Sequence, residues 1–169
     1  MTSQPRRRTL ADRNRDAIIR DPHPESTQRP ERRARTTTTD TTTLSVSMTQ
    51  AEYNDVKAAF LADWQNNRQH DTLPSWVGAA LERHAHLTPA QRSELNGSGP
   101  KGNSPRSFTI ANIVADAISD AMAADAAAGI FLTRSGWCHN ALSVAVATAR
   151  DTNGGTLPSA PPRLPIRLA

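Results

Sequence analysis

A short pattern occurs twice in this chain, 61 residues apart. Residues 72–81 read TLPSWVGAAL and residues 133–142 read TRSGWCHNAL, so that a threonine, a tryptophan, an alanine and a leucine coincide. Each copy follows a stretch of alternating apolar and hydroxyl residues and then an alanine-rich helical pattern. Neither copy, at about 45 residues, can close a core alone. The repeat therefore predicts two half-domains of strand, helix and helix that bury their apolar faces on one another.

The two alternating stretches predict the strands. In residues 43–48 apolar side chains alternate with hydroxyl side chains, which is typical of a strand with one apolar and one polar face. Residues 107–110 repeat the alternation. We expect the two strands to pair inside one chain, because Phe108 and Ile110 would otherwise lack a strand partner. The alternative is a homodimer through residues 43–86.

Capping residues and prolines mark the predicted helices. Thr49 and Glu52 form a capping-box pattern, and Gly129 supplies a stop signal. Asp71 or Thr72 caps the second helix, and Thr133 or Ser135 caps the last one. These signals predict helices at about residues 49–67, 72–84, 88–95, 112–128 and 133–150.

Composition divides the chain into five segments. Residues 1–39 hold ten arginines, no lysine and five acidic residues, a net charge of +5, whereas residues 40–169 hold ten basic and eleven acidic residues. A segment so polar cannot bury enough surface to fold, and its charge favours a polyanionic partner. The predicted segments are a disordered arginine-rich arm (1–39), a first unit (40–95), a linker (96–106), a second unit (107–150) and a tail rich in proline and arginine (151–169).

Several function classes are disfavoured. One cysteine, Cys138, excludes an internal disulfide, and no apolar run approaches the ~20 residues of a membrane span. The arginine-rich start lacks the apolar region of a signal peptide, so the expected location is the cytoplasm. Cys138 and His139 are neighbours on a helix and face different ways, so we expect no catalytic dyad. We expect no enzyme activity, no cofactor and no metal site.

The order of elements resembles the ribbon-helix-helix family of DNA-binding proteins. Residues 43–86 match its strand, capped helix, turn and second helix, although the connection at residues 65–71 is longer than usual. With the arm and the tail, residues 40–169 resemble the ParB-type centromere-binding proteins of plasmid partition systems. The resemblance implies a mainly α fold with duplicated ribbon-helix-helix units, a short antiparallel β-ribbon and a disordered N-terminal arm.

The resemblance also implies the residues that contact DNA. The polar faces of the strands would read bases through Thr43, Ser45, Ser47, Ser107 and Thr109. The starts of the second helices would contact phosphate through Thr72, Ser75, Thr133, Arg134 and Ser135. Serine and threonine discriminate bases weakly, so affinity must also come from repeated sites and from the arm residues Arg6, Arg7, Arg8, Arg32, Arg33 and Arg35.

Partition adaptors of this kind stimulate a Walker-type ATPase through a flexible N-terminal segment. Here Leu10 offers an apolar anchor and Arg13 a candidate arginine finger, with Arg6, Arg7 and Arg8 as competitors. The expected function is a DNA-binding adaptor that coats repeated sites on a plasmid or the nucleoid and presents its arm to the ATPase. The alternatives are an antitoxin, whose tail (150–169) would wrap a toxin, and a repressor of its own operon.

Overall fold

The computed structural model describes residues 40–95, 102 and 104–168. The predicted disorder of the arm, and most of the predicted linker, lie outside these residues. The described elements are β1 (Thr41–Met48), α2 (Gln50–Asn67), α3 (Leu73–Ala85), α4 (Pro89–Glu94), β2 (Ser104–Ala111), α5 (Asn112–Ala127) and α6 (Arg134–Thr152).

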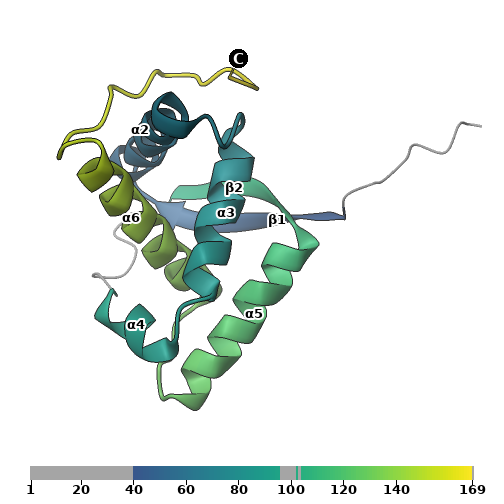
Figure 1. Cartoon of the computed structure of the whole chain (residues 1–169). Helices are drawn as coiled ribbons and strands as arrows, with labels where there is room; N and C mark the ends of the chain where they lie inside the picture. The colour runs from purple at the N-terminus through teal and green to yellow at the C-terminus, as the bar shows by residue number, and fades with distance from the viewer. Residues whose placement is uncertain (1–39, 96–101, 103, 169) are drawn as a thin grey trace, which may run out of the picture. The chain divides into compact units, whose positions relative to one another are not determined.

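The two strands pair with each other in an antiparallel sheet, as expected for pairing inside one chain (Figure 1). Thr43 lies opposite Thr109, and Ser45 lies opposite Ser107. Both strands are longer than the sequence predicted: β1 begins at Thr41, and β2 begins at Ser104 inside the predicted linker. Residues 104–106 are therefore part of the sheet.

The apolar face of the sheet closes a core that both halves of the chain share. Leu44, Val46, Phe108 and Ile110 are buried on this face, which α3 and α6 contact. The largest fully buried side chains come from both halves: Val46, Met48, Phe60, Val77, Leu81, Ile118, Trp137, Cys138 and Leu142. Because a two-stranded ribbon is marginal in water without such packing, the helices and the sheet stabilise one another.

The predicted helix starts are confirmed at four positions. Thr49 and Thr88 each form a complete capping box, and Thr72 and Thr133 accept hydrogen bonds from Ser75 N–H and Gly136 N–H. The caps are therefore Thr72 rather than Asp71, and Thr133 rather than Ser135. Helix α5 has no side-chain cap, and the N–H of its first residue donates to the Asp40 carbonyl at 2.8 Å instead.

The repeated tryptophans make matching contacts. Trp76 Nε1 donates to Asp63 Oδ2 at 2.7 Å, and Trp137 Nε1 donates to Asp125 Oδ2 at 2.9 Å. The surroundings differ, because Asp125 is 3% exposed and also holds the buried guanidinium of Arg92, with Nη2 to Oδ1 at 2.7 Å. Arg92 comes from α4, so this short helix is fixed to α5 by a buried ion pair.

The expected fold class, mainly α with duplicated ribbon-helix-helix units, is wrong. The described residues form a mixed architecture of five helices and one two-stranded antiparallel sheet. The strands pair between the two halves, as the sequence predicted, but the halves are not copies of one ribbon-helix-helix unit. The halves also differ in content: α4 follows α3, whereas an extended tail follows α6. Strand pairing and burial of a common core need only complementary apolar faces, so they do not require two copies of one unit.

Candidate nucleic-acid interface

The polar face of the sheet is exposed and carries hydroxyl groups. We call this surface the outer face; it consists of Thr41, Thr43, Ser45, Ser47, Pro105, Ser107, Thr109 and Ala111. All are exposed except Ser47 and Ala111, which are half-buried. The structure thus brings all five predicted base-reading residues onto one surface. It adds Thr41, which the sequence analysis missed although threonines 41–43 favour a strand.

Backbone hydrogen bonds set the spacing of the outer-face side chains. Asn112 N–H donates to Asp40 O across the sheet, while Ser47 N–H points away from β2 and donates to Ser135 Oγ at 2.9 Å. Alternation of the ladder then makes Thr43–Thr109 and Ser45–Ser107 non-hydrogen-bonded pairs. In such pairs the side chains lie closest, with Cα atoms ~4.5 Å apart. The four hydroxyls form a compact cluster on a ribbon narrow enough for a major groove ~12 Å wide.

The start of α6 flanks the outer face on the β1 side. Arg134 is exposed and lines a groove of about 180 Å³ with Thr42, Thr43, Leu44 and Ser45. Its Nη2 donates to the Ala115 carbonyl at 3.3 Å, which leaves the rest of the guanidinium available. The predicted phosphate residue Arg134 and the predicted base readers Thr43 and Ser45 therefore line one groove.

Two other predicted phosphate residues at this end have structural tasks. Thr133 Oγ1 accepts from Gly136 N–H at 3.1 Å, and Ser135 Oγ accepts from Ser47 N–H. Ser135 fixes the outer edge of β1 to α6. The main-chain N–H groups of Arg134 and Ser135 lie in the first turn of α6, where the helix dipole favours an anion.

The start of α3 flanks β2 but is a poorer anion site. Thr72 Oγ1 accepts from Ser75 N–H at 3.3 Å, and Ser75 Oγ contacts His70 Nδ1 at 3.1 Å. Pro74 removes one N–H from the first turn. Asp71 adds a carboxylate at the same end, paired with Arg167. Ser75 lines a groove with Thr109, so the structure brings this predicted phosphate residue and this predicted base reader together. The start of α6 nevertheless suits a phosphate better than the start of α3.

Positive charge near the outer face is sparse among the described residues. Arg106 lies on the opposite face of β2, 4.7 Å above the Tyr53 ring, and its Nη2 donates to Gln50 Oε1 at 2.6 Å. Arg134 is the basic side chain that the structure places beside the base-reading cluster. The predicted arm residues Arg6, Arg7, Arg8, Arg32, Arg33 and Arg35, like Leu10 and Arg13, lie outside the described residues.

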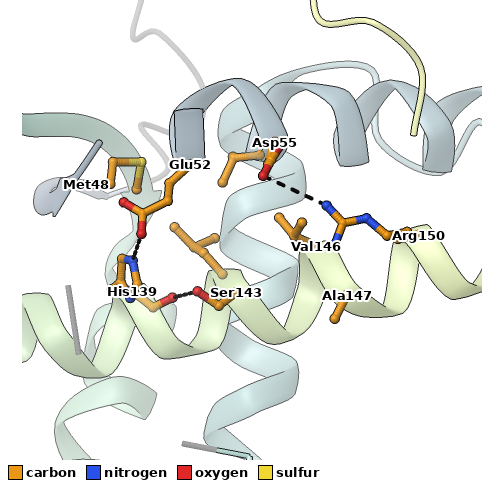
Figure 2. Close-up of a pocket in the computed structure, with 10 residues that line it drawn as sticks. Met48, Glu52, Asp55, His139, Ser143, Val146, Ala147 and Arg150 are labelled. Atoms are coloured by element: carbon orange, nitrogen blue, oxygen red, sulfur yellow. Dashed lines mark hydrogen bonds and ion pairs between the residues drawn. The ribbon is translucent and has the colours of Figure 1, made fainter. Parts of the chain in front are cut away.

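Apart from the grooves beside the outer face, a polar cavity lies between α2 and α6 (Figure 2). His139 Nε2 contacts Glu52 Oε1 at 3.2 Å, while Glu52 Oε2 accepts from Thr49 N–H at 2.6 Å. Partial burial raises the pKa of Glu52, but the hydrogen bonds from Thr49 and the contact with His139 outweigh this and hold it below its ordinary value. Ser143 Oγ donates to the main-chain carbonyl of His139 and not to its ring. The contact between Glu52 and His139 thus connects the start of α2 to α6. Ser143 is not activated as a nucleophile, because in the part of the chain that the structure describes no ring nitrogen accepts its hydroxyl proton.

Cys138 is unsuited to catalysis. Its side chain is fully buried, and burial raises the pKa of the thiol to about 12, against the opposing effect of Arg134. Across residues 40–95, 102 and 104–168, no cluster of three potential metal ligands is found. Within the same residues, no helix combines the length and apolar character that a membrane crossing requires.

Comparisons with known proteins give no family for this chain. It matches no protein-family model, no curated protein and no solved structure.

Proposed function

We propose that this protein is a sequence-specific DNA-binding adaptor of a plasmid or chromosome partition system. The observation that carries the proposal is the outer face, where the paired hydroxyls of Thr43 with Thr109 and Ser45 with Ser107 are exposed beside Arg134. A two-stranded ribbon of this width fits the major groove, and its side chains meet base edges there. The sequence resemblance to ParB-type centromere-binding proteins supports the assignment to partition.

Affinity and specificity come from different parts of the chain in this proposal. Residues 40–169 have a slight excess of acidic residues, so the arm with its net charge of +5 supplies most phosphate contacts. Arg35 precedes Thr41 by six residues, so the chain between them spans at most ~21 Å. Hydroxyls read bases loosely, so tandem sites supply the remaining affinity.

Footprinting on the DNA around its own gene, with a matched pair of variants, tests this function. Thr43→Ala, Ser45→Ala, Ser107→Ala and Thr109→Ala together remove four reading hydroxyls, each worth ~0.5–1 kcal/mol. Specific binding should weaken by about 30-fold to 1,000-fold while non-specific binding and its salt dependence stay unchanged. The control variant, Thr148→Ala with Thr152→Ala, removes two exposed hydroxyls of α6 that bond only to their own helix. Equal specific affinity in both variants would refute the DNA-reading face.

The same footprint separates partition from plain repression of the operon. Tandem protected repeats support the partition adaptor, and one short operator supports a repressor. The antitoxin alternative requires the tail to leave its own chain before it can wrap a toxin, because Arg167 Nε lies 2.6 Å from Asp71 Oδ2. We therefore prefer the adaptor.

The proposed partner of the arm is a Walker-type ATPase. Arg13→Ala should abolish stimulation of ATP hydrolysis, with Leu10 as the apolar anchor and Arg6, Arg7 and Arg8 as the competing contacts. Specific DNA binding should remain nearly intact, because the reading hydroxyls are elsewhere. Full stimulation by a chain that lacks residues 1–20 would remove this role of the arm.

A further inference from the structure

The described tail, residues 156–168, crosses α2 and ends beside the start of α3 (Figure 1). Lys57 Nζ donates to the carbonyl of Pro161 at 2.8 Å and to that of Pro162 at 3.5 Å. Farther along, Arg167 Nε lies 2.6 Å from Asp71 Oδ2, and Leu168 N–H donates to Asp71 O at 2.8 Å. Two anchor points on the folded body thus hold the tail, and we call Lys57 and Asp71 together the tail site.

Lys57, in the middle of α2, is unusual because its charged side chain is buried. Its side chain is 3% exposed, although a buried ammonium is costly without partners. Among the described residues no carboxylate forms an ion pair with it, and its Nζ lies 5.3 Å from the centre of the Tyr53 ring. The hydrogen-bond acceptors come from the tail. An extended proline-rich segment suits this task because its carbonyls have no internal partners.

The tail is held by few contacts. It contains no helix or strand, and its half-buried leucines Leu157, Leu164 and Leu168 pack at the edge of the core. Gly154 and Gly155, both with positive φ (+71° and +84°), connect it to α6. Glycine adopts such backbone without strain, so this joint can redirect the chain.

We propose that the tail site also binds the tail of a second copy, so that neighbouring chains exchange tails. Every contact in the exchanged form is the same as in the closed form, which makes exchange a low-cost route to association. In dilute solution the tether keeps the tail on its own chain at an effective concentration in the millimolar range. Exchange becomes favourable when copies are held side by side; that this happens on repeated DNA sites rests on the proposed function.

Two full-length variants test the exchange without DNA. The site variant, Lys57→Met with Asp71→Asn, has a defective tail site and an intact tail. The tail variant, Leu164→Ser with Arg167→Ala, has an intact site and a defective tail. When the site variant, labelled at its N-terminus, is titrated with the tail variant, fluorescence anisotropy should rise to saturation. Binding should be about tenfold weaker with the wild-type chain as titrant, because its own tail fills the site.

Controls make the result decisive. A chain with all four substitutions should bind neither variant. Arg163→Ala in the tail of the site variant should change nothing, since among the described residues Arg163, unlike Arg167, forms no ion pair with the folded body. Thermal unfolding by circular dichroism checks that each variant folds; if one does not, the single changes Asp71→Asn and Arg167→Ala replace the pairs. Absence of binding between folded variants up to ~1 mM would overturn the proposal. Equal binding of an unrelated proline-rich peptide would also overturn it and assign the site to general proline-rich ligands. Neither outcome affects the DNA-binding proposal, since no DNA is present.

Discussion

Replacing Asp125 or Asp63 by alanine removes the same indole contact from two different environments. In both variants a tryptophan Nε1–H loses its carboxylate acceptor, at 2.9 Å for Trp137 and 2.7 Å for Trp76. Asp125 also binds Arg92, whose Nε and Nη2 donate to its two oxygens at 2.7–3.1 Å. Arg92 is 2% exposed, so Asp125→Ala leaves a buried charge without its counter-ion.

The expected costs differ by several fold. Loss of one hydrogen bond at the half-buried Asp63 should lower the free energy of unfolding by about 1 kcal/mol. Loss of one partner from a buried ion pair costs about 3–5 kcal/mol, and the broken Trp137 bond adds about 1 kcal/mol. The carbonyls of Ala85, Leu87 and Ala121 still accept from the guanidinium, which keeps the sum near the lower end, at about 4 kcal/mol.

Urea unfolding followed by tryptophan fluorescence and circular dichroism measures both costs. The double variant Arg92→Met with Asp125→Leu, which removes both charges, should recover most of the loss caused by Asp125→Ala. If Asp125→Ala and Asp63→Ala destabilise the chain equally, within about 0.5 kcal/mol, the reasoning about the buried charge is wrong.

Three further predictions concern titration, thiol reactivity and DNA. Burial, with a smaller effect of Arg92, lowers the pKa of His84 to about 4. Between about pH 4 and about 6.5 the unfolded chain therefore binds more protons than the folded chain. The free energy of unfolding should fall by up to about 3 kcal/mol as the pH falls through this window. The dependence should disappear from urea titrations of His84→Phe and persist in His86→Gln; its persistence in both would exclude His84 as the source. The Cys138 thiol, with its pKa raised to about 12, should react with a thiol-specific dye only after urea is added, and rapid labelling of the native chain would contradict its burial. Arg134→Ala should reduce the slope of log affinity against log salt for DNA by about one, and an unchanged slope would remove Arg134 from the phosphate contacts.

The local elements were predictable because their signals are local. The alternation in residues 43–48 defines one apolar and one hydroxyl face whatever lies around it, and Thr49, Thr72, Thr88 and Thr133 each cap a helix through contacts with residues three positions on. Even the pairing of the two strands followed from the repeat, since each apolar strand face needed a partner. For the same reason the exposed hydroxyls of the candidate interface could be named from the sequence.

Only the tertiary structure decided which residues far apart in the sequence contact one another. Ser135 looked like a phosphate contact, but it lies at the edge of β1 and accepts from Ser47 N–H, 88 positions away in the sequence. The buried partnership of Arg92 with Asp125 and the capture of proline carbonyls by Lys57 join residues 33 and 104 positions apart. Sequence spacing carries no signal for such contacts, because they depend on which helix packs on which. The expected fold of duplicated ribbon-helix-helix units was wrong for the same reason: the described residues form one mixed architecture whose two halves make different long-range contacts.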